Sequence, residues 1–300
     1  MDGSYHVPLF TGQALYHEIV LKQTIIGSKE RLTVVEKKIV FFDLDGTLLN
    51  EDKIVLESTK QALRALQEKG VYTVISTGRA PLMFDWLCRE LAIDSFVSMN
   101  GQHVIHEGEE LFSNPIDADI LHDLATYARK QGHGLSYSNH LAFAVSEENH
   151  PFIQPSINGL KLEFPPANFE FYLQNSVHQV QVYCESRDAG QYMNRYADFT
   201  FIQWGEYAFD MLPEGASKAV GIRKLLEKLG IPRENSYAFG DGRNDIEMLE
   251  YVGTGVAMDN AVPELKDIAD HVTTSCSEDG ILDGLLHIGL LETIDVMTVK

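Results

Sequence analysis

The chain has 300 residues, of which 44% are hydrophobic and 23% are charged, and its formal net charge is −20. This much apolar material excludes a predominantly disordered chain. The negative charge argues against nucleic acid and anionic membranes as standing partners, because both select for basic surfaces. No apolar run approaches the roughly 20 residues that a membrane-spanning helix requires.

The cysteines and the N-terminal segment favour a cytoplasmic protein. The three cysteines lie far apart, and no Cys-x-x-Cys pair indicates a zinc or redox site. Such a small, odd number is typical of a reducing compartment. Residues 1–37 lack the basic, apolar and small-residue regions of a signal peptide, and they contain no strong strand pattern. We therefore expect residues 1–37 to be an N-terminal extension, an appendage to the fold.

Strands and helices are predicted to alternate in the part of the chain that follows. The apolar run Lys38–Phe42 is typical of a buried strand, and Val71–Ser76 of a second one. A helix is predicted between them over Glu57–Lys69, ended by Gly70. The remaining elements predicted here are a helix over Pro81–Leu91, a strand over Phe96–Met99, and a turn at Asn100-Gly101 into a strand over Gln102–His106.

The last third of the chain alternates in the same way. The predicted helices are Lys218–Leu229, Asp245–Tyr251, Val262–Ala269 and Ile281–Leu290, and the predicted strands are Ser236–Phe239, Gly255–Met258 and His271–Thr274. Helices that connect parallel strands cover both faces of the sheet. These two parts together therefore predict an α/β core built on a Rossmann-like parallel sheet.

The middle of the chain, residues 116–213, breaks this alternation. Two helices are predicted there, over Ala118–Lys130 and Asn168–Gln174. The predicted strands are Leu135–Ser138, Leu141–Val145, Val180–Cys184, Phe201–Trp204 and Tyr207–Met211. Strands joined by short turns indicate an antiparallel sheet. We therefore predict an α/β core at 38–115 and 214–300, interrupted by an α+β insertion at 116–213.

Two aspartates follow the first predicted strand, in the run Asp43-Leu44-Asp45-Gly46-Thr47. Residues two apart in an extended backbone point to the same side. Both carboxylates are therefore expected at the carboxyl edge of the sheet, where open α/β folds bind ligands. A solvated turn would also suit these residue types, because aspartate and glycine favour turns.

Three further groups of polar residues lie at strand–helix junctions. Gly240-Asp241-Gly242-Arg243-Asn244-Asp245 follows another predicted strand and adds two more carboxylates. The turn Thr77-Gly78-Arg79 can bind phosphate through the Thr77 hydroxyl and the backbone N–H groups beyond it. Lys218 begins a helix, where the helix dipole disfavours a cation, so we expect it to have an anionic partner.

These junctions can converge because the carboxyl ends of parallel strands share one edge of the sheet. Together they would form a site for one divalent cation and one phosphate. Mg²⁺ prefers hard oxygen ligands and is often held by carboxylates and substrate phosphate. The sequence therefore predicts a Mg²⁺ cofactor and a phosphorylated substrate.

At these residues the chain resembles the haloacid dehalogenase-like superfamily of phosphatases, from about Lys38 to Gly289. The run Asp43–Leu48 matches the first motif, Thr77 the second, Lys218 the third and Gly240–Asp245 the fourth. The large insertion, Asn100-Gly101 and the run Gly255–Ala261 resemble the Cof-type subfamily with its α+β cap. The chain departs from the family pattern in its N-terminal extension and in Ala80-Pro81, where Arg-Pro commonly continues the second motif.

The resemblance implies a catalytic role for four side chains. Asp43 would be the nucleophile that attacks phosphorus. Asp45 would protonate the leaving group and then activate water, so that one hard displacement becomes two steps. Thr77 and Lys218 would hold the phosphoryl oxygens. Gly78 and Arg79 would also bind phosphate, and Asn100 is a weaker candidate.

The resemblance also implies the ligands of the cation. Asp43, the backbone carbonyl of Asp45, and Asp241 would bind Mg²⁺. Asp245 would support the metal site, and Asn244 would orient the phosphate or the lysine. The implied enzyme is a phosphomonoester hydrolase that acts on a small phosphorylated metabolite, as a monomer or homodimer. Sugar phosphates are our first expectation for the substrate, while nucleotide, flavin and pyridoxal phosphates stay open.

Two other functions are compatible with the same core. A phosphomutase of the phosphomannomutase type would need cationic side chains for a second phosphate. The middle segment contains only Lys130, Lys161, Arg129, Arg187 and Arg195, which disfavours a mutase. A non-enzymatic phosphate or metal sensor would be expected to lack Asp45 or Lys218. The histidines of the middle segment are scattered in sequence, so we expect structural positions for them and no second metal site.

Overall fold

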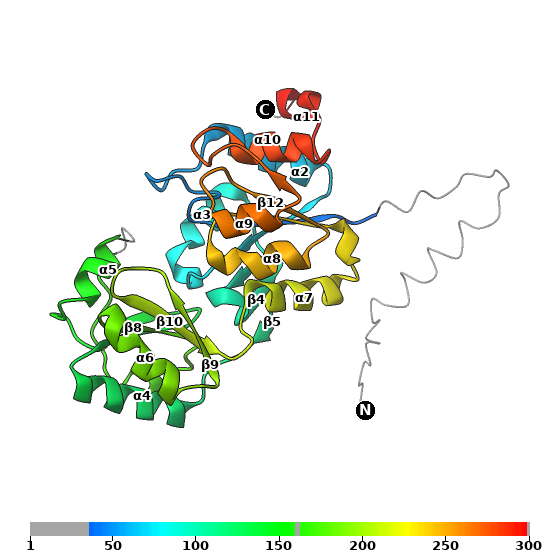
Figure 1. Cartoon of the computed structure of the whole chain (residues 1–300). Helices are drawn as coiled ribbons and strands as arrows, with labels where there is room; N and C mark the ends of the chain where they lie inside the picture. The colour runs from blue at the N-terminus through cyan, green and yellow to red at the C-terminus, as the bar shows by residue number, and fades with distance from the viewer. Residues whose placement is uncertain (1–35, 160–162, 299–300) are drawn as a thin grey trace, which may run out of the picture. The chain divides into compact units, whose positions relative to one another are not determined.

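The computed structural model describes residues 36–159 and 163–298 (Figure 1). The N-terminal extension expected at residues 1–37 lies outside this range except for its last two residues. The described chain forms two sheets, one of eight strands and one of five. They belong to a Rossmann-like α/β core and to an inserted α+β cap, as the sequence predicts.

In their order across the core sheet, the first six strands run parallel to one another, and each of the last two runs antiparallel to the strand before it. Its strands, in their order across the sheet, are β13 (His271–Val272), β12 (Thr254–Ala257), β11 (Ser236–Gly240), β1 (Ile39–Phe42), β2 (Tyr72–Ser76), β3 (Phe96–Ser98), β4 (His103–His106) and β5 (Glu109–Ser113). All four residues of β1 are buried, because helices cover a parallel sheet on both sides.

Helices pack on the two faces of this sheet and bury alternate side chains of β1. On one face, Val40 and Phe42 join the apolar residues of α2 (Glu57–Glu68), α3 (Asp85–Leu91) and α10 (Gly280–His287). On the other face, Ile39 and Phe41 join those of α7 (Lys218–Leu229), α8 (Ile246–Tyr251) and α9 (Pro263–Ile268), which follow one another in Figure 1. A further helix, α11 (Thr293–Thr298), contacts α2.

The strand order creates a crevice at the carboxyl ends of β1 and β11. From β1 the chain proceeds outward to β2 and β3, and after the insertion it returns to β11 on the other side of β1. Open α/β sheets bind ligands where the chain direction reverses in this way. The residues that follow β1 and β11 are Asp43 and Asp241, so the fold brings both acidic motifs to this point.

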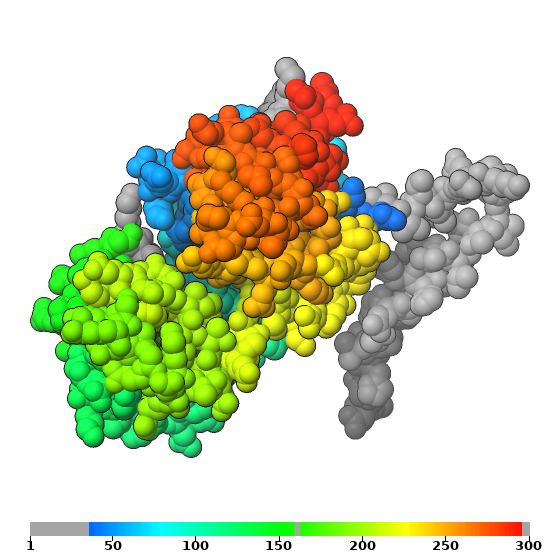
Figure 2. Space-filling view, viewed as in Figure 1, coloured from blue at the N-terminus to red at the C-terminus, as the bar shows by residue number. Residues whose placement is uncertain are grey.

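The cap is built on an antiparallel sheet in the order β7-β6-β8-β10-β9. Its strands are β6 (Gly134–Ser138), β7 (Phe143–Val145), β8 (Gln179–Tyr183), β9 (Phe199–Gln203) and β10 (Ala208–Pro213). Its helices are α4 (Ala118–Gln131), α5 (Ile153–Gly159) and α6 (Ser186–Arg195). The cap residues, drawn in shades of green, gather in one body in the space-filling view (Figure 2).

Side chains alternate between the two faces of the cap sheet, so that one face is apolar and the other is polar. Val180 and Val182 of β8 pack into an apolar cluster with residues of α4 and α6. Because successive side chains of a strand alternate between faces, Gln179 and Gln181 lie on the opposite face. That polar face forms part of the cleft described below.

Several elements differ from those predicted. The strand β5 and the helices α5, α6 and α11 were not expected; α6 buries only Ala189 and Tyr192, so its apolar signal is weak. The helix predicted over Asn168–Gln174 is a single 3₁₀ turn at Phe171–Leu173. The helix predicted over Pro81–Leu91 divides into a 3₁₀ turn and α3, because Phe84 has a non-helical φ of −136°.

Candidate active site

The two acidic motifs meet where β1 and β11 end. The backbone N–H of Asp43 donates to the carbonyl of Phe239 at 3.0 Å, which continues the pairing of the two strands. Gly46 has a φ of +84°, and a Cβ at this position would lie 2.3 Å from Oδ2 of Asp241. Only glycine accepts both the backbone conformation and this close approach. The turn after Asp43 therefore allows the two motifs to come into contact.

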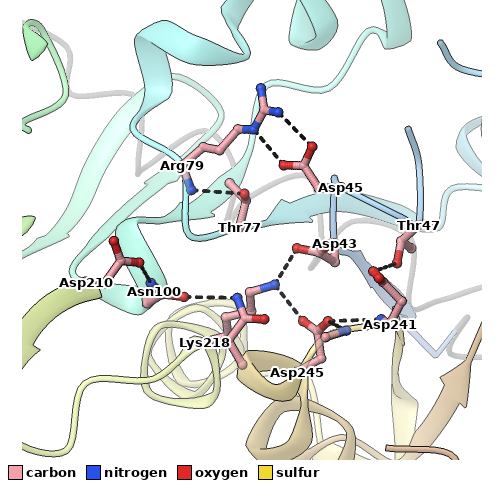
Figure 3. Close-up of polar contacts among 12 residues, drawn as sticks. Asp43, Asp45, Thr47, Thr77, Arg79, Asn100, Asp210, Lys218, Asp241 and Asp245 are labelled. Carbon is pink, nitrogen blue, oxygen red and sulfur yellow. Dashed lines mark hydrogen bonds and ion pairs between the residues drawn. The ribbon is translucent and has the colours of Figure 1, made fainter. Parts of the chain in front are cut away.

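The Lys218 ammonium lies between the carboxylates of Asp43 and Asp245 and joins them (Figure 3). Its side chain is fully buried, with Nζ hydrogen-bonded to Asp43 Oδ1 and 2.6 Å from Asp245 Oδ1. Burial alone would lower the pKa of Lys218, but Asp245 and Asp43 outweigh it and raise the pKa. The lysine is therefore held as a cation, and its expected anionic partners are present.

Asp43, Asp241 and Asp245 together form an acidic group that can hold a metal ion. One carboxylate oxygen from each lies within 4.8 Å of the others. Burial raises the pKa of Asp241 to about 7, with Asp245 adding to the effect. Burial also raises the pKa of Asp43; Lys218 opposes this, while Asp245 and Asp241 contribute to it. Three carboxylate oxygens this close together, two of them on groups whose pKa is raised, fit a hard divalent cation such as Mg²⁺.

Neighbouring polar groups hold these carboxylates in place. Asp245 Oδ2 accepts hydrogen bonds from the backbone N–H groups of Asp241, at 3.0 Å, and Gly242, at 2.9 Å. The Thr47 hydroxyl donates to Asp241 Oδ1 at 2.9 Å. Asn244 donates its side-chain amide to Asn100 Oδ1 at 3.3 Å. The loop after β11 is thus fixed both to the β1 motif and to the turn after β3.

Asp45 points away from Lys218 and binds two other cations. Arg79 contacts both of its carboxylate oxygens, and Lys53 Nζ lies 2.6 Å from its Oδ1. Burial would raise the pKa of Asp45, but the charges and hydrogen bonds of Arg79 and Lys53 lower it below the ordinary value. Sequence reasoning did not single out Lys53, because a lysine in the loop Asn50–Lys53 has no pattern that sets it apart.

The turn at Thr77 and Gly78 lies at the same edge of the core sheet as the two acidic motifs. The Thr77 side chain is buried, and its Oγ1 accepts a hydrogen bond from the backbone N–H of Arg79 at 3.1 Å. Thr77 and Gly78 line the same cleft as Asp43 and Asp241. The hydroxyl and the backbone of this turn are therefore placed where a phosphate bound beside Asp43 would lie.

The cap contributes polar residues to this cleft, whose volume is about 280 Å³. Asp210 of β10 is buried and accepts hydrogen bonds from Gln179 at 3.2 Å, Gln181 at 3.1 Å and Asn100 at 3.3 Å. Burial raises the pKa of Asp210 to about 7, and the hydrogen bonds from Gln181, Trp204 and Asn100 oppose the rise. The cap residues that line the cleft are Phe143, Gln179, Gln181, Tyr183, Trp204 and Asp210.

The structure brings all nine sequence-predicted site residues together. Seven of them line the cleft: Asp43, Asp45, Thr77, Gly78, Arg79, Asp241 and Asn244. Lys218 and Asp245 lie beneath Asp43 and are fully buried. Sequence reasoning missed Asp210, Gln179 and Gln181, because the alternation of side chains along a strand was the only indication that they face the cleft.

No helix among residues 36–159 and 163–298 is long and apolar enough to cross a membrane.

Comparisons with known proteins identify a family and several relatives of the chain. The family model of haloacid dehalogenase-like hydrolases matches residues 40–285. A protein of Bacillus subtilis named putative phosphatase YkrA is 38% identical over 86% of this chain and all of its own length. A crystal structure from Geobacillus kaustophilus covers 85% of this chain and all of its own with 45% identity and a TM-score of 0.81. The structure of a subclass IIB sugar phosphatase, BT4131, covers the same shares with 28% identity and a TM-score of 0.76.

Proposed function

The chain belongs to the haloacid dehalogenase-like hydrolases as a Cof-type phosphatase, and we propose that it hydrolyses phosphomonoesters with Mg²⁺ through a phosphoryl-aspartate on Asp43. The observation that carries this proposal is the position of Asp43. Its carboxylate contacts the Lys218 ammonium, has an oxygen within 4.8 Å of those of Asp241 and Asp245, and lines the same cleft as Thr77. One carboxylate thus adjoins both a candidate cation site and a candidate phosphate site.

In the first proposed step, Asp43 attacks phosphorus. A bond forms between a carboxylate oxygen and phosphorus, and the bond from phosphorus to the substrate oxygen breaks. Asp45 donates its proton to the departing oxygen, so that the product leaves as an alcohol. Lys218 and the Thr77 turn stabilise the charge on the transferring phosphoryl oxygens.

In the second proposed step, water attacks the phosphorus of the phosphoryl-aspartate. Asp45 now accepts a proton from the water, the Asp43 carboxylate is released and inorganic phosphate forms. Asp45 is thereby returned to its protonated state for the next cycle. The two steps require Asp43 to be ionised at the start and Asp45 to be protonated.

The candidate cation site fits Mg²⁺ in its donor chemistry. Asp43, Asp241 and the backbone carbonyl of Asp45 would hold the ion, and Asp245 would support it through the loop N–H groups that it binds. A bound Mg²⁺ would offset the repulsion between the carboxylates and an incoming phosphate. The raised pKa values of Asp43 and Asp241 support this role, because they reflect buried negative charge in need of a cation.

Arg79 is proposed to exchange partners when the substrate binds. In the structure its guanidinium holds Asp45 by two hydrogen bonds of 2.7 Å. A substrate phosphate carries more charge and offers the same bidentate geometry. Transfer of Arg79 to the phosphate would free Asp45 and allow its pKa to rise, which a proton donor requires.

The polar face of the cap supports sugar phosphates as the substrate class. Gln179, Gln181 and Asp210 place amide and carboxyl groups toward the cleft, and such groups can both donate to and accept from hydroxyls. Trp204 lies beside them and offers an apolar ring face. The size of the cleft suits a small metabolite. The likeness to a protein named as a sugar phosphatase is a further reason for this choice.

The same lining disfavours a phosphomutase. A mutase must hold a second phosphate, and cationic side chains normally do this. Among the described residues, the cap side chains that line the cleft are apolar, amide, aromatic or acidic, and the two cations, Lys53 and Arg79, both come from the core. We propose cap boundaries of 116 and 213, since the chain leaves the core sheet after β5, and the first element of the core that follows the cap strands is α7.

The proposal is tested by trapping the intermediate. The enzyme is mixed with Mg²⁺ and a hexose phosphate, quenched in acid and analysed by peptide mass spectrometry for a phosphoryl group on Asp43. A screen of phosphate release over sugar, nucleotide, flavin and pyridoxal phosphates then ranks the substrates. A phosphoryl group on another residue would contradict the mechanism, and a preference for aromatic phosphates would contradict the substrate class alone.

A further inference from the structure

A second group of metal-ligating side chains lies outside the candidate active site. His103 of β4 and Glu110 of β5 come from the core, and His140 comes from the turn between β6 and β7 of the cap. One ligand atom from each of the three lies within 4.8 Å of the others. The His103 and His140 rings stack with centroids 4.9 Å apart, and the His178 ring of the cap meets His103 edge-on at 5.6 Å.

One ring nitrogen of each histidine in this cluster lacks a partner. The Nδ1 atoms of His103, His140 and His178 are all buried and have no hydrogen-bond partner among residues 36–159 and 163–298. The His103 and His178 side chains are each only 1% exposed. Buried polar atoms are normally paired, so three orphaned nitrogens in one place indicate that a group is needed to satisfy them.

Burial also favours the neutral state of two of these rings, those of His103 and His178. Burial lowers the pKa of His178 to about 4, with His103 and His140 adding to the effect. Burial likewise lowers the pKa of His103, although its hydrogen bond of 2.9 Å with Glu110 opposes this. A neutral imidazole offers a lone pair to a metal, and an imidazolium does not.

Two neighbouring features complete the arrangement. The Ser113 hydroxyl lies 2.8 Å from His178 Nε2 and fixes the orientation of that ring, as outer hydrogen bonds do in metal sites. A surface depression lined in part by His103, His140, Gly108 and Leu141 gives a path from solvent to the cluster. Entry of an ion therefore requires no opening of the fold.

We propose that His103, Glu110 and His140, with His178 beside them, bind a divalent transition metal of the Zn²⁺ type. Imidazole and carboxylate ligands suit Zn²⁺, whereas the oxygen-only group at Asp43 suits Mg²⁺. Two ligands come from core strands and the others from the cap, so the ion links the cap to the core. None of these four residues lines the cleft, so the link constrains the cap from outside it.

The test uses the full chain, freed of metals and then saturated with Mg²⁺ to fill the oxygen-only site. Co²⁺ is titrated in as a spectroscopic substitute for Zn²⁺, and the intense visible absorption of four-coordinate Co²⁺ is recorded. Zn²⁺ affinity is measured by calorimetry on the same samples. We expect one Co²⁺ and one Zn²⁺ per chain, and a thermal midpoint that rises with Zn²⁺.

The variants His140→Ala and Glu110→Gln change side chains that are not fully buried, and both should fold. Each is expected to weaken Zn²⁺ binding at least about 100-fold and to abolish the Co²⁺ spectrum, since loss of an outer partner alone costs 10–100-fold. His122→Gln is the matched control, because His122 bonds Tyr172 and belongs to neither metal-ligating group of the described residues. The proposal is overturned if wild type binds no Co²⁺ beside Mg²⁺, if His140→Ala binds as wild type does, or if His122→Gln loses binding equally.

Discussion

The Arg79 guanidinium holds both carboxylate oxygens of Asp45, with Nε 2.7 Å from Oδ2 and Nη2 2.7 Å from Oδ1. Two aspartates only two residues apart are thereby placed in opposite settings. Asp43 contacts a buried lysine and two carboxylates, whereas Asp45 contacts two cations in a more exposed position. This division underlies the different tasks that we propose for them.

Replacement of the nucleophile should abolish turnover and leave the fold intact. Asp43→Asn keeps the size of the side chain but removes the attacking carboxylate, and we expect phosphate release to fall about 10⁵-fold or more. The variant also removes a buried charge, so its thermal midpoint should not fall. Asp123→Asn, in an exposed pair with Arg195, is the control. Near-normal activity of Asp43→Asn would rule out the mechanism.

Loss of the acid/base group should depend on the leaving group. We expect Asp45→Asn to slow hydrolysis of an alkyl phosphate about 10²–10⁴-fold, because the departing alkoxide needs a proton. A nitrophenyl phosphate needs none, so its first step should persist and a rapid burst of nitrophenol should precede a slow steady state. Stopped-flow absorbance measures the burst. Equal slowing of both substrates, with no burst, would show that Asp45 acts otherwise.

Removal of Arg79 should raise the pKa of Asp45. Burial then acts with only Lys53 to oppose it, and NMR titration of the labelled carboxyl would report the shift. The pKa of Asp45 is lowered in the folded protein, so the pair adds stability above the ordinary carboxyl pKa and loses it as the pH falls. Arg79→Gln should therefore be less stable than wild type at pH 7, with the difference shrinking at pH 3. Arg89→Gln, in an exposed pair with Asp85, should show neither effect.

Asp210 should make the protein less stable at alkaline pH. Its folded pKa is raised to about 7, so its contribution is fully present below the ordinary value near 4 and is lost as the pH rises through 7. Between pH 5 and pH 8 the stability of Asp210→Asn relative to wild type should rise, by at most about 3 kcal/mol. Urea unfolding at the two pH values measures the difference. A constant difference would show that Asp210 is already ionised at pH 5.

Removal of Mg²⁺ should have its largest effect at alkaline pH. The pKa of Asp241 is raised to about 7, so protons compete with the metal below that pH and repulsion between carboxylates grows above it. Chelation should lower the thermal midpoint more at pH 8 than at pH 6. In the metal-free state, Asp241→Asn should be more stable than wild type at pH 8. If Mg²⁺ raised the midpoint equally at both pH values, the acidic group would not be its site.

The sequence was sufficient to predict those helices and strands that local residue patterns specify. The helix Lys218–Leu229 begins and ends at the predicted residues, because the apolar period and Gly230 define it within a few residues. The strand Ile39–Phe42 was evident from its apolar run. The helix α6 and the strand β5 were missed, since few of their residues are buried and both contain few apolar residues.

The residues of the candidate site likewise divide into features that the sequence predicts and contacts that only the fold creates. The sequence by itself determined that carboxylates, a hydroxyl and a lysine follow strands, since strand and turn chemistry act between near neighbours in the chain. Only the tertiary structure decided that Lys53 and Arg79 share Asp45, that Asp210 bonds Asn100 at a separation of 110 residues, and that His140 stacks on His103. Such contacts depend on strand order and on how the cap packs, and both follow from burying the apolar faces of many elements together.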